Sequence, residues 1–378
     1  MEYVSRFIDF FFSFKAYVML PIIIFIIALI VRMKIQDAFL SSLKLAVGFA
    51  GIFVVFDFFV ANIGPAVKAI ISVRGLDYPV LDVGWPPLAA ITWSSIIAPL
   101  TIPLILLINL LMIATNTTRT IDIDIWNYWH FALIGALIQK TTGSYVLAFT
   151  ATALIGIYTL KIADWTAPYV EEECGLKGIC ITTLSVNGLL PVGVACNKLF
   201  DAIPGFRKLS YNPSKSTDSK LKILNEPMVI GILVGVFLAV LAGYKVKESM
   251  ELCVHIAAVM FLLPHCGAII GKGMEPISLK LKDAIQRRFP SKTNLVIGMD
   301  SGVIMTNPSV LTTGILLMPI AIAVAFLLPG NKVIPLGDLP NVISVMAIIV
   351  LIMRGNVVRS VILGIPIVAG YLLISTDL

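Results

Sequence analysis

The stretch VLDVGWPPLAAITWSSIIAPLTIPLILLIN, residues 80–109, interrupts an apolar region in a way that a plain membrane helix does not. Pro86 and Pro87 are adjacent, and each removes a backbone donor and clashes with the preceding turn, so a regular helix breaks there. Lipid cannot satisfy the unpaired peptide groups of broken backbone, which therefore belongs inside protein or beside a watery cavity. Transporters build substrate sites from such segments. The alternative is a surface loop with an interfacial tryptophan belt.

Composition places the chain in a membrane. Of its 378 residues, 58% are hydrophobic and 13% are charged, whereas about 25% are charged in an ordinary soluble domain. We therefore expect an all-α polytopic protein of the cell (inner, cytoplasmic) membrane. Basic cytoplasmic loops explain the net charge of +6 without any nucleic acid partner. The first apolar run lacks a small-residue cleavage site, so we expect no cleavable signal peptide.

Apolar runs predict about ten membrane spans, counting about 20 residues for a full span and fewer for a broken one. We place them at residues 17–31, 43–61, a run ending near 114, 125–138, 145–160, 227–243, 252–270, 311–328, 342–353 and 357–374. A second broken segment, LVIGMDSGVIMTN, covers residues 295–307. A less hydrophobic section covers residues 161–222, and a charged linker, KLKDAIQRRFPSK, follows the seventh span.

The two halves of the sequence look alike. MKIQDAF at 33–39 resembles YKVKESM at 244–250, and broken segments containing Asp82 and Asp300 occupy corresponding places. We expect one membrane domain with a first repeat at about 15–165, a connecting section at about 166–224 and a second repeat at about 225–378. Five spans per repeat would invert the second copy, and inverted repeats place a transport site at their interface. Similar apolar composition also produces matches by chance.

The distribution of basic residues predicts the orientation. Lys and Arg follow the first, fifth, seventh and ninth spans, which lie on one side if every span crosses. That side is expected to be cytoplasmic, which leaves the N-terminus outside. Lys245 and Lys247 oppose this orientation but are outnumbered.

The sequence lacks the motifs that several kinds of chemistry require. The five cysteines show no CxxC spacing and the three histidines are scattered, so we expect no disulfide framework, metal or cofactor. No GxxxxGK[ST] loop is present, so the chain does not itself use ATP. It has no cysteine loop that would accept a phosphoryl group, and whether it counts as an enzyme stays open.

Several strings resemble the galactitol-type IIC component of the phosphoenolpyruvate-dependent sugar phosphotransferase system, a family related to the ascorbate-type IIC components. They cover nearly the whole chain in matching order: DVGWP at 82–86, TWSS at 92–95, DIDIWNYWH at 122–130, ALIQKTTGS at 136–144, GDL at 337–339 and RGNVVRSVILG at 354–364. The resemblance implies a homodimer of inverted five-helix repeats with re-entrant hairpins in a mobile core. It also implies an eleventh span, which this sequence does not include.

The resemblance implies a polyol permease, with galactitol as the expected substrate. A separate IIB protein, supplied through IIA, would phosphorylate the polyol from a phosphocysteine as it crosses the bilayer. One alternative is a proton-coupled secondary transporter with Asp300 and His130 as the proton relay. Another is a non-transporting scaffold that recruits IIB.

Ionisable residues inside a membrane are costly and are therefore candidates for function. Asp300 lies in a break flanked by glycine, where it could bind hydroxyls or cap the following half-helix. Asn127 and His130 share a helical face, although His130 could instead pair with a helix carbonyl. Asp122 and Asp124 precede the same helix, and we favour a capping role for them. We expect Asp122→Asn to lower stability more than binding.

The remaining candidate ligands are weaker. Trp85 and Trp93 could stack on a polyol or anchor the chain at the interface. Asn187 stands where the related family often has the histidine of a Pro-His-Gly-like string. The candidate substrate-binding set is completed by Asp82, Gln139 and Asn307, the last of which ends the second broken segment.

Overall fold

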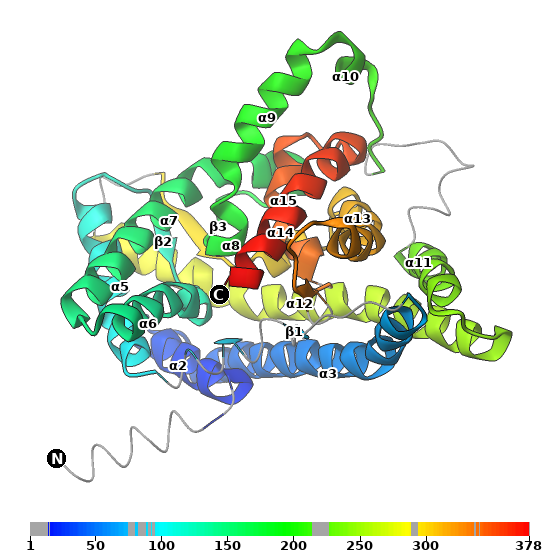
Figure 1. Cartoon of the computed structure of the whole chain (residues 1–378). Coiled ribbons are helices and arrows are strands. Elements are labelled where there is room, and N and C mark those ends of the chain that lie inside the picture. The colour runs from blue at the N-terminus through cyan, green and yellow to red at the C-terminus, as the bar shows by residue number, and fades with distance from the viewer. Residues whose placement is uncertain are drawn as a thin grey trace. The chain divides into compact units, whose positions relative to one another are not determined.

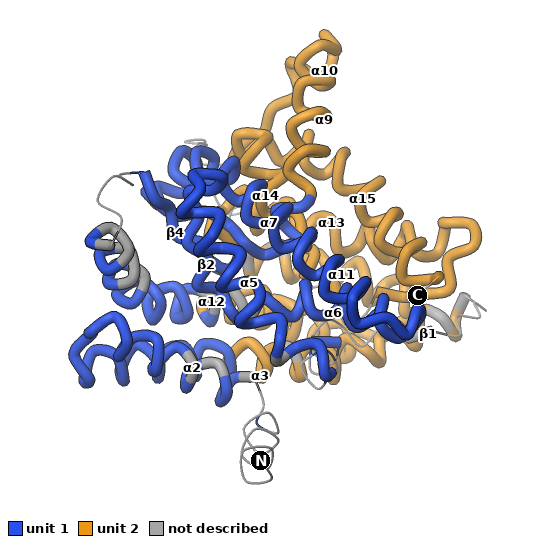
Figure 2. The backbone as a smooth tube through the Cα atoms, turned by 90° about the vertical axis from the view of Figure 1, so that its left-hand side faces the viewer, with its two compact units in different colours: residues 1–50, 86–188, 266–303 blue, residues 51–85, 189–265, 304–378 orange. Residues whose placement is uncertain are grey.

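The computed structural model describes residues 14, 16–74, 80–81, 88–89, 92, 95–213, 227–288, 294–335, 338–339 and 341–377. The chain divides into two compact units (Figure 2). Unit 1 contains residues 1–50, 86–188 and 266–303, and unit 2 contains residues 51–85, 189–265 and 304–378.

Unit 1 is built from helices around a small parallel sheet (Figure 1). Its helices are α2 (Ala16–Ile30), α5 (Ile97–Ala114), α6 (Trp129–Thr142), α7 (Tyr145–Cys174) and the short α8 (Leu184–Asn187), with the start of α3 (Ile35–Arg74) and the end of α12 (Val246–Arg288). Its strands are β2 (Thr120–Asp122), β3 (Ile179–Ile181) and β4 (Val296–Met299). Single 3-10 turns, η1 (Ile125–Tyr128) and η3 (Ser301–Ile304), follow β2 and β4.

Unit 2 has a comparable set of helices. They are α9 (Leu190–Ala202), α10 (Pro204–Lys208), α11 (Pro227–Ala242), α13 (Pro308–Leu327), α14 (Asn341–Ile352) and α15 (Val357–Asp377), with the end of α3 and the start of α12. Its strands are β1 (Val80–Leu81) and β5 (Val333–Ile334). Helix α14 lies in the core of this unit, because its side chains from Met346 to Ile352 are all buried.

The prediction of a polytopic membrane protein is confirmed. Within the part of the chain that the structure describes, four helices are long and apolar enough to cross a membrane: 35–70 within α3, α7, α13 and α15. Shorter apolar helices occur at 17–30, 100–114, 231–242 and 341–352. Helices are the expected spanning elements because each satisfies its own backbone groups in lipid.

Three helices extend well beyond the predicted spans, and α3, predicted to end near 61, continues to Arg74. Helix α7 continues to Cys174 rather than ending near 160, and α12 continues to Arg288 through most of the predicted charged linker. The added turns of α7 and α12 are rich in Glu, Lys, Arg, Gln and Ala, which are strong helix formers. Hydropathy indicates where a helix leaves the lipid, whereas high helix propensity allows the same helix to continue into a polar environment.

All strand pairs are parallel, and both sheets join the two halves of the sequence. In unit 1, β4 lies between β2 and β3, and in unit 2, β1 pairs with β5. Strand β4 follows α12 from the second half, whereas β1 follows α3 from the first half. Each unit therefore combines helices from one half of the sequence with a strand from the other.

Side chains provide hydrogen-bond partners for backbone groups at both edges of the three-stranded sheet. Asn109 of α5 donates from Nδ2 to the Thr120 carbonyl at 2.8 Å and accepts from the Asp122 amide at 3.0 Å. At the opposite edge, Thr166 Oγ1 accepts from the Ile181 amide at 2.9 Å. An open sheet edge inside a membrane protein would leave backbone groups unpaired, and these helices provide the missing partners.

Candidate functional site

The three strands of unit 1 end at one edge of the sheet, which brings distant polar residues together. The register pairs Asp122 with Gly298 and Ile181 with Met299. Carrying the parallel register two residues further sets Asp124 beside Asp300. Thr183 follows the neighbouring strand β3 at the same edge, where its Oγ1 accepts from the Ser301 amide at 3.0 Å.

One amide links the two carboxylates. Asn127, in the η1 turn, lies 2.6 Å from Asp124 Oδ2 and 2.5 Å from Asp300 Oδ2, measured from its Nδ2. Thr183 Oγ1 is a third, longer acceptor at 3.2 Å. The amide group has two hydrogens, so its donors are fully used by the two short bonds. Asn127 therefore holds the two aspartates at a fixed separation.

Asp300 has the capping role that the sequence suggested, and its role as a substrate ligand stays a prediction. Its Oδ1 accepts from the Gly302 amide at 2.6 Å, which caps the η3 turn. Its Oδ2 accepts from Asn127 and, at 3.4 Å, from the Thr183 hydroxyl. The capping bond orients the carboxylate and leaves the second oxygen directed at the cluster of polar groups.

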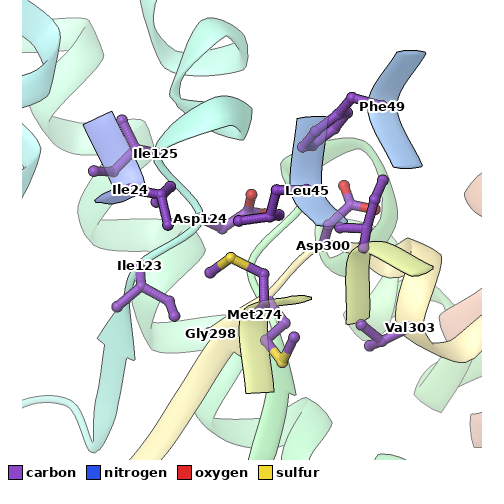
Figure 3. Close-up of a pocket in the computed structure, with 12 residues that line it drawn as sticks. Ile24, Leu45, Phe49, Ile123, Asp124, Ile125, Met274, Gly298, Asp300 and Val303 are labelled. Carbon is purple, nitrogen blue, oxygen red and sulfur yellow. The ribbon is translucent and has the colours of Figure 1, made fainter. Parts of the chain in front are cut away.

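A pocket lies beside these carboxylates (Figure 3). Asp124 and Asp300 supply its polar groups, and the rest of the lining is Ile24, Leu45, Phe49, Ile123, Ile125, Ile270, Met274, Gly298, Met299 and Val303. All of these residues belong to unit 1. The free volume is about 30 Å³, which is room for about one water.

Burial sets the protonation of the carboxyls beside β2, which lies outside the candidate membrane spans. Burial raises the pKa of Asp122 to about 7. Burial also raises the pKa of Asp124, and the nearby charge of Asp300 raises it further. Because two close carboxylates repel each other, a pair of this kind binds a proton more readily than isolated carboxylates do.

The predicted ligands fall into three groups: those in or beside this cluster, those outside the described residues, and those elsewhere in the described part of the chain. Asp300 and Asn127 are in direct contact. His130 is connected to them through the backbone, because its Nδ1 lies 3.0 Å from the Asn127 carbonyl oxygen, and its ring stacks on Trp129 at 3.9 Å. The sequence had suggested a carbonyl of a neighbouring helix as the alternative partner, whereas this carbonyl lies three residues earlier, in the η1 turn. Asp82, Trp85 and Trp93 lie outside the described residues and stay predictions.

Two of the other predicted ligands, Asn187 and Asn307, have side-chain hydrogen bonds outside this cluster. Asn187 is fully buried, and its Nδ2 donates to the carbonyls of Thr159 at 3.2 Å and Ile181 at 3.0 Å. Asn307 caps α13 in unit 2, accepting from the Ser309 and Val310 amides. Gln139 lies in the last turns of α6. No observation here tests these three as substrate ligands.

Asp124 and Thr183 were not among the predicted ligands. Asp124 was expected to cap a helix, and its carboxylate accepts from both the backbone amide and the side chain of Asn127, in the η1 turn that leads into α6. It therefore combines a capping contact with a place in the polar cluster. The sequence signal was the pair of aspartates in IDID at 121–124, which hydropathy alone does not distinguish from a cap. Among the described residues, no cluster of three or more His, Cys, Asp or Glu is arranged to hold a metal ion.

Comparison with known proteins identifies the family. A family model described as a PTS system sugar-specific permease component, EIIC-GAT, matches residues 10–377. The chain belongs to this permease family. It is 34% identical over 360 residues to the PTS system galactitol-specific EIIC component of Escherichia coli K12, covering 95% of this chain and 79% of that protein. A putative permease IIC component of the same strain is 32% identical over 369 residues, covering 98% and 84% of the two chains. The resemblance noted in the sequence is therefore confirmed, and the two carboxylates belong to a PTS permease.

Proposed function

We propose that this PTS permease binds galactitol beside Asp124, Asn127 and Asp300 and delivers it to a cytoplasmic IIB protein that phosphorylates it. The observation that carries the proposal is the pair of carboxylates, held by one amide, in an otherwise apolar pocket. The galactitol specificity of the 34% identical relative supports the choice of polyol. IIB would itself be phosphorylated through IIA.

The pocket has the chemistry that a polyol requires. Each hydroxyl donates one hydrogen bond, and a carboxylate oxygen is a strong acceptor that contributes about 1.5–3 kcal/mol per bond. The carbon backbone of a polyol presents C–H groups, which fit side chains such as Met274, Ile125 and Val303. A few well-placed polar groups in an apolar lining are typical of small-molecule sites.

The same carboxylates favour release of the product. The accepting hydroxyl oxygen forms the new P–O bond while the S–P bond of the phosphocysteine breaks. The hydroxyl proton passes to a nearby carboxylate acting as a general base, for which Asp300 is the candidate. The product then carries about two negative charges at neutral pH. Two aspartates repel this product, and its charge prevents return through lipid.

The pocket must widen before a polyol can enter. Its free volume of about 30 Å³ suits one water, whereas small-molecule sites usually measure about 300–1,000 Å³. The lining comes from α2, α3, α12 and the strand ends, so a movement of α2, α3 or α12 within unit 1 would open it. Such a movement is what alternating access demands.

Three matched turns support the proposal of two inverted five-helix repeats. The α2–α3 turn contains Arg32 at φ 61°, and the α11–α12 turn contains Gly243 at φ 67°. Left-handed residues also follow α5 and α13, at Asn116 and Gly330. The α6–α7 and α14–α15 turns repeat the pattern with Gly143 and Gly355. On this basis the repeats occupy about 15–165 and 225–378, with a connecting section at about 166–224.

The exchange of strands between halves supports the same architecture. Strand β4 follows the 43-residue α12 and pairs with β2, and β1 follows the 40-residue α3 and pairs with β5. The correspondence makes the Asp82 segment the counterpart of the Asp300 segment. We further propose about ten spans, a homodimer, and location in the cytoplasmic membrane with the connecting section inside.

Galactitol affinity of purified, folded variants tests the site. Asp300→Asn keeps the shape of the side chain but removes its charge, and we expect binding to weaken about 10- to 100-fold, as loss of one or two charge-assisted bonds implies. Asp283→Asn is the control, because Asp283 is an exposed aspartate of α12. Unchanged affinity in Asp300→Asn would refute the assignment of this carboxylate to the site.

A further inference from the structure

We propose that α9 and α10, with the following residues to 213, form the docking surface for the phosphocysteine-bearing IIB protein. This segment is called the docking arm below, and all of it belongs to unit 2. Figures 1 and 2 show α9 leading to α10, which forms the tip of the arm. The inference rests on the proposed function, since it takes IIB as the partner.

The arm is fixed to α15 by a buried arginine. Arg359 is 7% exposed. It donates from Nη1 to Asp201 Oδ1 at 2.7 Å and to Asn197 Oδ1 at 3.2 Å. Its Nη2 donates to the Phe206 carbonyl at 3.3 Å. One guanidinium therefore joins α9 and α10 to the first turn of α15, and arginine suits this task because its donors form a rigid fork.

Further contacts join the two helices of the arm and fix its C-terminal end. Phe200 of α9 stacks on Phe206 of α10, with ring centroids 4.9 Å apart. After α10, the Asn356 side chain donates to the Leu209 carbonyl at 2.9 Å, and the Val357 amide donates to the Tyr211 carbonyl at 2.8 Å. A segment with this many side-chain and backbone bonds is a preorganised surface, which lowers the entropy cost of binding a partner.

The outer side chains of the arm are basic and apolar. Lys198, Arg207 and Lys208 are exposed, and the arm's one aspartate, Asp201, is bound to Arg359. Four large apolar side chains of the arm are exposed as well: Val192 at 44%, Leu199 at 57%, Ile203 at 38% and Leu209 at 45%. The orientation of the chain in the membrane is by itself a sufficient reason for basic residues on the cytoplasmic side. Orientation does not explain the rigid attachment of the arm or the apolar side chains beside the charges. Together these two features indicate a protein-binding surface.

Charge complementarity selects the occupant. A phosphocysteine carries a dianionic phosphoryl group at neutral pH, and a cationic surface steers such a partner and increases its association rate. Positive-inside orientation places the arm on the cytoplasmic side, where IIB is available. We therefore assign the surface to IIB.

Direct binding of IIB to the purified full chain in lipid nanodiscs tests the assignment. We expect Arg207→Glu/Lys208→Glu to weaken IIB affinity about tenfold at low ionic strength, with a smaller loss at high salt because exposed charges are screened. Galactitol affinity should be unchanged, which shows that the variant is folded. Lys245→Glu/Lys247→Glu is the matched control, because it reverses two exposed lysines in the α11–α12 region, predicted to lie on the opposite side. Its IIB affinity should equal that of the wild type.

The docking proposal is overturned if Arg207→Glu/Lys208→Glu binds IIB as tightly as the wild type does. It is also overturned if both double variants lose IIB affinity equally, or if the wild-type chain does not bind IIB. Galactitol phosphorylation is measured separately on the wild-type complex. A wild type that binds IIB through the arm without phosphorylating galactitol refutes the proposed function and leaves the docking surface supported.

Discussion

The central residue of the site is Asn127, whose side chain contacts two carboxylates that follow two different strands, β2 and β4. Asp124 and Asp300 are far apart in the sequence and meet only because β2 and β4 pair in parallel. Sequence reasoning identified Asp300 and Asn127 as separate candidates from their polarity in an apolar region. It assigned Asp124 to a cap, because the partner that makes it part of the site comes from strand register, a non-local property.

Asp122 offers a test through pH. Burial raises the pKa of Asp122 to about 7, above its usual value of about 3.9. The folded state therefore holds a proton that the unfolded state has lost over this interval, so stability should fall as pH rises from about 4 to about 7. Above the folded pKa both states are ionised and the whole cost of the buried charge is present.

We expect Asp122→Asn to reduce this pH dependence and to raise the melting temperature at about pH 8, because the amide stays neutral. The sequence had suggested a loss of stability, on the assumption of a charged cap. Melting curves in detergent at several pH values decide between the two. Asp283→Asn should keep the wild-type slope, and a wild-type slope in Asp122→Asn would contradict the effect of burial on Asp122.

At the scale of elements, hydropathy located most helices but no strand. Helices α2, α11, α13, α14 and α15 lie close to the predicted spans. The strands have only two to four residues, too short to show an alternating pattern. The broken segments that begin at residues 80 and 295 were predicted from proline, glycine and aspartate. Their pairing in sheets was not, because cross-strand partners leave no local signal.

The sheet edge gives a prediction at this scale. Asn109→Leu removes the partners of the Thr120 carbonyl and the Asp122 amide, and each unsatisfied buried group costs about 1–3 kcal/mol. We expect a lower melting temperature together with weaker galactitol binding, since β2 positions Asp124. Asn62→Leu is the control, because Asn62 is only partly buried and its side chain donates to the Phe58 carbonyl of the same helix, α3. Wild-type stability in Asn109→Leu would mean that the edge does not need this side chain.

At the scale of the whole molecule, the two units have related compositions. Each contains helices of one sequence half and a strand from the other, and this exchange follows from long helices that contribute residues to both units. The sequence predicted the repeats from short matching strings and from the corresponding places of the two broken segments. It could not predict the exchange, because that depends on which strands pair.

Orientation is tested by labelling single cysteines in a background without the five native ones. We expect Ser210→Cys, in the docking arm, to be protected from an impermeant reagent in intact cells. Lys245→Cys should react, because one more span separates the two positions. Charge bias is the reason for this orientation. Labelling of Ser210→Cys from outside, with Lys245→Cys protected, would reverse the topology.

The central claim is that transport is coupled to phosphorylation by IIB, and uptake into vesicles tests it most directly. Purified chain is reconstituted and supplied with labelled galactitol, with and without phosphorylated IIB on the cytoplasmic face. The account predicts that label accumulates only with phosphorylated IIB and is recovered as galactitol phosphate. Accumulation of free galactitol driven by an imposed proton gradient, without IIB, would contradict the account and favour a proton-coupled transporter.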